Sequence, residues 1–264
     1  WRASSMKAIK RNFVAPVIAL WATVILCLVF GVRPWDSSGI VMGKFYALVG
    51  FALSAAVLAA ILSEFYRGAR VIGKQTGKNL VSSTWLLTRR NTRRYGGYLV
   101  HIGLLIIIVG LCGSAFNRSV EKEMGLHDKM AVGPYALECM GFSQDSNLNY
   151  DSEFAMLNVS RNGDAPFQMS PEKRVYHASE QPQTMVAIHS NPFWDLYVVY
   201  EGVNPGTGQP IIKAFLNPLV GWIWAGFVLL VFGTLVAIVP PLTPATASLR
   251  VPARQTSVAE PVVH

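Results

Sequence analysis

Four long apolar runs dominate the pattern of hydrophobic and polar positions along the chain. They cover residues 13–32, 45–62, 98–116 and 219–239. Each is about 20 residues long, and at ~1.5 Å per helical residue this length spans the ~30 Å hydrocarbon core of a bilayer. We therefore predict four membrane-spanning helices, with residues 1–12 as a short segment before the first of them.

A secretory signal peptide is the competing interpretation of the first run, because basic residues precede it. However, the run is too long for the apolar region of a signal peptide, and it ends in Arg33-Pro34-Trp35-Asp36 without a small-residue cleavage site. A lipoprotein signal is excluded as well, since the bulky Leu26 stands directly before Cys27. The sequence therefore predicts a spanning helix here.

Residues 118–212 have a different pattern, in which short strand-like runs are separated by turn residues. The runs are 154–160, 173–177, 184–189, 196–200 and 211–215. Asn162-Gly163, which follows the first run, is a strong hairpin-turn signal. We expect a small β-sandwich or barrel-like domain here, tethered at both ends to spanning helices. Residues 240–264 are rich in Pro, Ala and Thr, and we expect them to be disordered.

The composition agrees with a membrane protein. Of the 264 residues, 52% are hydrophobic and only 14% are charged, and the mean hydropathy is +0.34, a combination that is rare in a soluble domain of this length. The net charge of +8 could indicate nucleic-acid binding. The basic residues flank apolar runs, however, so membrane orientation explains them better, and we predict no nucleic-acid partner.

Charge also predicts the orientation of the chain. Residues 65–94 carry eight basic residues and no acid. The positive-inside rule places them in the cytoplasm, either as an amphipathic stretch along the membrane surface or as a solvated loop. Alternation then puts both termini inside and residues 118–212 outside. The predicted fold class is a mainly α membrane protein, with four transmembrane helices and a small extracytoplasmic β-rich domain inserted between the third and the fourth.

No catalytic residue can be named from the sequence. Cys27, Cys112 and Cys139 are too far apart for a disulfide framework or a Cys-x-x-Cys site, and no Cys-x-x-Cys-His occurs. A Ser-His-Asp arrangement, a phosphate loop and paired carboxylates are not recognisable either. The histidines outside the apolar runs lack metal-ligand spacing, and we expect surface or strand positions without a metal for them. They are His127, His177, His189 and His264.

His101 is the one ionisable side chain within the apolar runs. Because a polar group in hydrocarbon needs a hydrogen bond, a metal or a cavity, such a histidine is a candidate functional residue. On a helix its face is aliphatic, and the opposite face carries glycines at seven-residue spacing. The aliphatic face consists of Leu104, Leu105, Ile108 and Cys112, and the glycines are Gly96, Gly103 and Gly110. The glycines suit close approach of another helix. The histidine face suits either a haem, with the imidazole as iron ligand, or a hydrogen bond to a neighbouring helix.

Three segments resemble the C-terminal part of the CcmF/NrfE family of haem lyases, which act in cytochrome c maturation. Residues 93–103 (RRYGGYLVHIG), followed by an apolar run that ends in GSAF at 113–116, are similar to the family segment that introduces a transmembrane haem-ligating histidine. Residues 180–197 and 217–224 are two further similar stretches in the same order. Together the similar segments cover residues 93–239.

The resemblance implies a role in haem binding and haem transport at the bacterial inner membrane. His101 would be one of two axial ligands to the iron of a structural b-type haem. The implied partners are the upstream CcmF segment, a CcmE-type haem chaperone, a CcmH-type subunit, apocytochrome c and the lipid bilayer. The family's tryptophan-rich WWD motif and its other haem-ligating histidines are missing here. The chain would therefore be a haem lyase component that cannot attach haem alone, and because position 1 is Trp, we expect a truncated protein or a split-gene product.

Two other functions stay open at this point. A b-haem subunit of a membrane electron-transfer complex would normally carry paired histidines on its own helices, and only His101 lies within an apolar run here. In a cofactor-free membrane assembly module, His101 would form only a hydrogen bond. Whether the chain is itself an enzyme is also left open.

Overall fold

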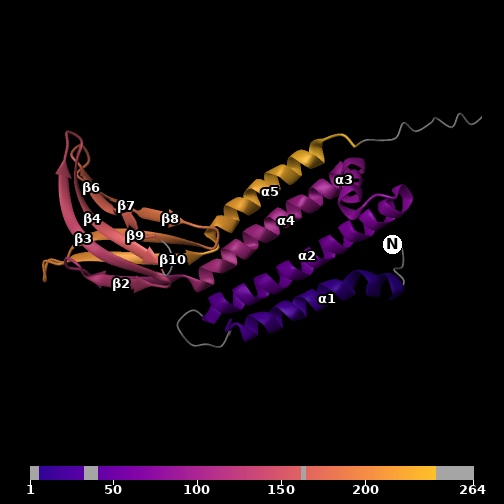
Figure 1. Cartoon of the computed structure of the whole chain (residues 1–264), viewed down its shortest axis with the longest axis horizontal. Coiled ribbons are helices and arrows are strands. Elements are labelled where there is room, and N and C mark those ends of the chain that lie inside the picture. Colours follow the sequence, from indigo (N-terminus) through magenta and orange to yellow (C-terminus); the bar gives the residue numbers. More distant parts are fainter. Residues whose placement is uncertain (1–5, 33–40, 162–164, 242–264) are drawn as a thin grey trace, which may run out of the picture.

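The computed structural model describes residues 6–32, 41–161 and 165–241, in which a row of helices carries a β-rich domain at one end (Figure 1). The helices are α1 (Met6–Val29), α2 (Val41–Thr76), α3 (Leu80–Arg90), α4 (Thr92–Cys112), the 3₁₀ turn η1 (Gly113–Phe116) and α5 (Val220–Ile238). Strands β1–β10 lie between η1 and α5 in the chain. Helices α1, α2, α4 and α5 pack side by side in that order, and the β-rich domain lies beyond one end of α4 and α5.

Four helical segments are long and apolar enough to cross a membrane, which confirms the prediction from the hydrophobic pattern. They are Lys10–Val29, Gly43–Thr76, Thr92–Phe116 and Val220–Ile238. Large apolar side chains on these helices are exposed, such as Trp21 at 60% and Leu235 at 59%. Such a surface is costly in water but is the expected surface of helices that face lipid.

Residues 65–94, for which an amphipathic stretch and a solvated loop were both left open, are mostly helical. Helix α2 continues past the end of its apolar run to Thr76, which gives it a length of about 54 Å at 1.5 Å per residue. Gly77, with a φ of 68°, then ends the helix in the left-handed conformation that glycine adopts without strain. The basic half of α2 therefore extends beyond the length that the hydrocarbon core requires.

Helix α3 occupies most of the rest of this segment. The side chain of Asn79 caps its start by accepting a hydrogen bond from the Ser82 N–H at 3.0 Å. The buried side of α3 packs against α2 and α4, where Ile72, Leu87 and Tyr95 form a small buried cluster. This packing explains why a segment with so many like charges is folded as helix.

Two antiparallel sheets form the β-rich domain, so of the two predicted forms, a sandwich or a barrel-like domain, the structure shows the sandwich. The strands are β1 (Arg118–Glu123), β2 (Lys129–Val132), β3 (Tyr135–Ser146), β4 (Tyr150–Arg161), β5 (Phe167–Met169), β6 (Glu172–Tyr176), β7 (Pro182–Met185), β8 (Ala187–Ser190), β9 (Trp194–Val203) and β10 (Pro210–Pro218). One sheet has the order β1-β10-β9-β8, and the other has β2-β3-β4-β6-β7 with β5 paired to β4. The predicted strand runs coincide with β4, β6, β7 with β8, β9 and β10, except that His177, the last residue of the run 173–177, lies in the turn after β6.

Some predicted features lie outside the described residues. They are the Asn162-Gly163 turn, Arg33-Pro34-Trp35-Asp36, His264 and the tail beyond position 241. The strands on either side of the turn, β4 and β5, pair antiparallel, with Leu157 opposite Met169. This pairing is the arrangement that a hairpin produces.

Alternating side chains from both sheets fill the core of the sandwich. Leu137, Leu157 and Ile212 are fully buried there. The hydroxyl of Tyr200 donates a hydrogen bond to Glu153 at 3.2 Å across the sheets. Burial, together with this carboxylate, raises the pKa of Tyr200 to about 12. The phenol therefore stays uncharged at neutral pH and keeps its role as a donor.

The sandwich is fixed to α4 and α5 at the end of the helix row. Strands β1 and β10, where the chain enters and leaves the domain, are neighbours in one sheet. Leu219, the residue before α5, has a left-handed φ of 62°, and its N–H donates to the carbonyl of Phe193 at 2.8 Å. The indole N–H of Trp222 donates to the carbonyl of Pro192 at 2.9 Å. The turn between β8 and β9 is thereby held against the start of α5.

Candidate functional site

Glycines bring α4 and α5 into close contact. A Cβ atom added to Gly103 would lie 2.7 Å from the carbonyl oxygen of Gly226, and one added to Gly96 would lie 2.6 Å from the backbone nitrogen of Ala237. The third glycine of the predicted stripe, Gly110, faces Ile223 in the same way. Since these distances leave no room for a side chain, the glycine face of α4 is the face that packs on α5.

This contact turns His101 away from α5. The side chain is exposed, and its Nδ1 atom lies 2.7 Å from the carbonyl oxygen of Gly97, one helical turn earlier. Because a carbonyl oxygen can only accept a hydrogen bond, Nδ1 carries the proton and donates it. The Nε2 atom of a neutral ring then holds a free lone pair, and no hydrogen bond to Nε2 is found among the described residues.

The orientation of this ring is the one that metal-ligating histidines commonly have. Such histidines donate one ring N–H to a carbonyl or carboxylate, which fixes the tautomer and leaves the other nitrogen for the metal. In α4 this acceptor belongs to the same helix, at Gly97. The donor chemistry of His101 therefore fits an axial ligand to a haem iron.

The aliphatic face predicted around His101 is only partly free. Leu104 is 46% exposed, whereas Leu105 is 8% exposed and packs inward. Ile108 and Cys112 contact α2 at Gly50. The exposed surface around the imidazole is therefore smaller than helical periodicity suggests, because α2 covers the C-terminal part of this face of α4.

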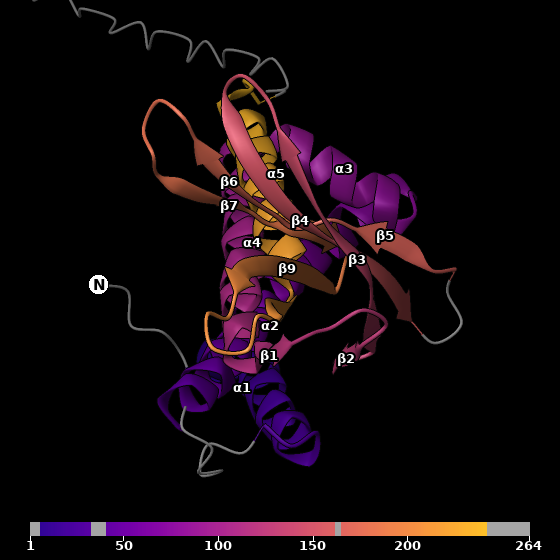
Figure 2. The ribbon, with the colours of Figure 1, turned by 90° about the vertical axis from the view of Figure 1, so that its left-hand side faces the viewer.

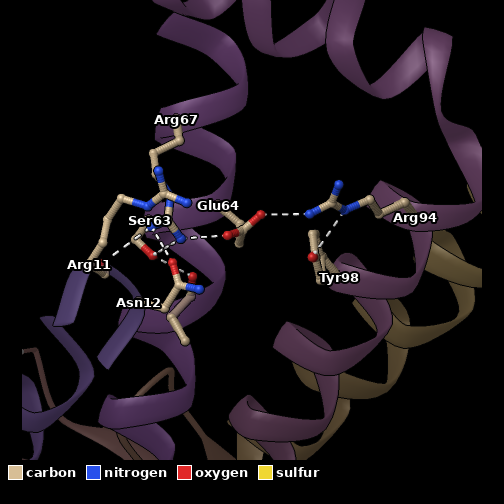
Figure 3. A network of polar contacts seen from close by, with 8 residues as sticks. Arg11, Asn12, Ser63, Glu64, Arg67, Arg94 and Tyr98 are labelled. Carbon is tan, nitrogen blue, oxygen red and sulfur yellow. Dashed lines mark hydrogen bonds and ion pairs between the residues drawn. The ribbon is translucent and has the colours of Figure 1, made fainter. Parts of the chain in front are cut away.

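A polar network joins α1 and α2 to the start of α4 (Figure 3). One carboxylate oxygen of Glu64 pairs with Arg67, and the other lies 2.6 Å from Arg94. The Nε–H of Arg94 also donates to the hydroxyl of Tyr98 at 3.2 Å. This carboxylate thus links α2 to α4 two helical turns before His101.

The same network reaches α1 through Arg67. Its guanidinium donates to the side-chain oxygen of Asn12 at 2.9 Å and to the carbonyl of Arg11 at 3.3 Å. Glu64 stands directly before the basic segment 65–94, and the sequence analysis assigns it no role. The signal that could have found it is the isolation of one carboxylate among many basic residues at the end of an apolar run.

The histidines of the sandwich have separate partners. The His127 ring is 3.7 Å from the Glu138 carboxylate, and His189 stacks on Phe167 with 4.1 Å between ring centroids. The described residues contain no group of three side chains suited to hold a metal ion.

His177 lies at the tip of the second sheet, where its Nε2 atom is 3.2 Å from Asp151. A hydrogen bond from the Ser146 hydroxyl, followed by the one from His177, lowers the pKa of the Asp151 carboxyl. These contacts hold the ends of β3, β4 and β6 together.

The sequence of residues 115–218 matches the family described as the CcmF C-terminal β-sandwich. The chain is similar to the C-terminal part of the CcmF proteins. A cytochrome c-type biogenesis protein CcmF from Pseudomonas fluorescens is 29% identical over 239 residues, which are 90% of this chain and 33% of that protein. The CcmF of Escherichia coli is 26% identical over 227 residues, which are 85% of this chain and 32% of that protein.

Two further comparisons extend the relation to CcmF. The cytochrome c-type biogenesis protein NrfE of Haemophilus influenzae is 27% identical over 146 residues, which are 55% of this chain and 23% of that protein. A solved structure of the cytochrome c haem lyase CcmF shares the fold with a TM-score of 0.64 at 19% identity, covering 91% of this chain and 36% of that one. The chain thus spans about a third or less of these CcmF-type proteins. Its apolar helices and this relation make it a multi-pass membrane protein.

Proposed function

We propose that the chain acts as the C-terminal part of a CcmF-type haem lyase and that α4 presents His101 as one axial ligand to a b-type haem. The observation that carries this proposal is the ring of His101, which is tied to Gly97 through Nδ1 and keeps Nε2 free on an apolar helix. The other axial ligand would come from outside the described residues.

The residues around His101 have a positioning role in this proposal. The carbonyl of Gly97 orients the ring, the glycines set the distance between α4 and α5, and Glu64 holds the start of α4 against α2. Together they restrict the position and the rotation of the helix that carries the ligand. A bound b-type haem would supply one-electron redox chemistry at this place.

The proposed partners follow from the same relation. They are the upstream CcmF segment, a CcmE-type haem chaperone, a CcmH-type subunit and apocytochrome c, with the sandwich as the domain that meets them outside the membrane. The thioether bonds of the mature cytochrome would form in the complete assembly, with groups that this chain does not itself contain.

Loss of the gene in its host is expected to remove covalently bound haem from the c-type cytochromes. Haem that is not attached leaves the apocytochrome in denaturing gels, so haem-stained gels of membrane fractions should lose these bands, and the full-length gene supplied in trans should restore them. Unchanged haem staining in the deletion strain would reject a role in cytochrome c maturation. A haem subunit of another electron-transfer complex would instead leave c-type bands intact and lower a respiratory activity.

The proposed orientation places the sandwich outside the cytoplasm, with the basic ends of α2 and α4 inside. Two exposed positions test it, Leu148 at the tip of the β3–β4 hairpin and Lys78 between α2 and α3. In intact cells a membrane-impermeant maleimide should label the Leu148→Cys variant and leave Lys78→Cys unlabelled, whereas permeabilised cells should show both labelled. The reverse pattern in intact cells would contradict the orientation.

A further inference from the structure

A groove of about 710 Å³ opens between α3, α4 and α5 at the basic end of the helix row. Its walls include Val81, Trp85 and Arg89 from α3, Leu99 from α4, and Phe232 and Val236 from α5. Most of these side chains are apolar. The volume is within the range of ~300–1,000 Å³ that small-molecule sites usually have.

Helix α3 gives this groove an amphipathic edge. One side of α3 is buried against its neighbours through Ser83 and Leu87. The other side exposes apolar groups, with Val81 at 80% and Trp85 at 65% exposure. Figure 2 shows α3 lying beside α4 and α5 rather than in line with them. A helix with these properties at the end of membrane spans is suited to the boundary between headgroups and acyl chains.

The charge at this edge is positive and is not balanced by acids. The sequence has no Asp or Glu between positions 65 and 117. In the described part of the chain, Glu64 forms ion pairs with Arg67 and Arg94, and no carboxylate partner is found for Arg89. Instead, the guanidinium of Arg89 lies 5.7 Å from the ring centroid of Trp85, at the mouth of the groove. An anion could therefore meet an uncompensated cation there.

We propose that this groove binds an anionic glycerophospholipid, whose acyl chain lies along α4 and α5 and whose phosphate meets Arg89. The apolar walls match a hydrocarbon chain, and the cationic mouth matches a headgroup with a negative charge. A zwitterionic lipid offers the same chain but a weaker attraction. The groove does not depend on haem ligation. On α4 it is lined by Leu99 and not by His101, two residues further on, and neither His101 nor the Gly97 carbonyl is part of its wall.

Native mass spectrometry of the full-length protein tests this site. The detergent-purified protein is mixed with equal amounts of phosphatidylglycerol and phosphatidylcholine, and the retained lipids are counted. The wild-type protein should retain one phosphatidylglycerol in preference to phosphatidylcholine. Arg89→Gln should lower this retention about fivefold, the usual contribution of one cation near an anionic surface. Thr84→Trp, which places a bulky side chain in the wall of the groove and narrows it, should lower the retention of both lipids.

Arg70→Gln is the matched control, because it removes the same charge from an exposed position on α2 that lines a different cavity. Its retention of phosphatidylglycerol should equal that of the wild type. The proposal is overturned if Arg70→Gln loses as much lipid as Arg89→Gln, or if Thr84→Trp retains the lipid unchanged. It is also overturned if the wild-type protein shows no preference, which is the result expected when another segment of the protein fills the groove.

Discussion

Replacing His101 with alanine is expected to remove most of the b-type haem signal from the purified full-length protein. The imidazole is the bond that α4 supplies to the iron in the proposed site, and alanine leaves that axial position without a ligand. Since even the loss of a group that only supports a ligand lowers metal affinity by about 10–100-fold, the haem content should fall about tenfold or more. The visible spectrum of the reduced protein and a pyridine haemochrome assay measure this loss.

The control for this variant is His189→Ala in the sandwich. His189 stacks on Phe167 and has no place in the proposed haem site, so its removal should leave the spectrum unchanged. In the haem-free state, the melting temperature of His101→Ala should be close to that of haem-free wild type, because the hydrogen bond of the ring is to Gly97 in its own helix. A b-type signal of wild-type size in His101→Ala would reject ligation by this residue and favour a hydrogen-bonding role.

The hydrophobic pattern predicts the existence of the helices better than their ends. An apolar run that is long enough to cross a bilayer has few stable forms other than a spanning helix. All four runs lie in helices that are long and apolar enough to cross a membrane. The apolar run of the second helix stops at Leu62, but α2 continues to Thr76. Helix propagation costs little once the helix exists, and Ile72 finds a buried position beyond the end of the run. Charge density alone therefore does not identify a loop.

Strands β1 and β3 show why part of the sandwich was not predicted. Strand β1 has the sequence RSVEKE and lies at the edge of its sheet, where charged side chains stay exposed. In β3 the pairing with β4 shifts in register between Cys139 and Gly141, and the less exposed positions beyond the shift carry Gly141 and Ser143 instead of large apolar residues. Strand β1 is specified by its pairing with β10, which lies far away in the sequence, whereas β3 pairs with β2 and β4, its neighbours along the chain.

Some residues of the candidate site can be predicted from the sequence, and others cannot. His101 can be found from the sequence because it is an ionisable group within an apolar run. The acceptor at Gly97 also follows from helical geometry, since it lies four residues earlier. The ion pair of Glu64 cannot be predicted from an apolar run or from helical geometry, because its partner Arg94 is 30 positions away. Only the packing of α2 on α4 brings the two side chains together.

The contact between α4 and α5 leads to the second prediction. Gly103→Ala should destabilise the protein by about 1–3 kcal/mol, since overpacking of a tight contact typically has this effect. The added methyl carbon would lie 2.7 Å from the carbonyl oxygen of Gly226 and from the backbone nitrogen of Leu230. Neither is a flexible side chain, so the two helices have to move apart. Urea unfolding in detergent, followed by tryptophan fluorescence, measures the change.

Gly97→Ala is the matched control on the same helix. An added Cβ atom at Gly97 meets nothing within 4 Å, and alanine favours a helix over glycine by about 1 kcal/mol. This variant should therefore be as stable as the wild type or slightly more stable, and it keeps the carbonyl that orients His101. If both alanine variants change stability alike, helix propensity rather than helix packing governs α4, and the glycine contact does not hold α4 on α5. If only Gly103→Ala is destabilised, the haem content of that variant reports whether the position of α4 also controls the ligand.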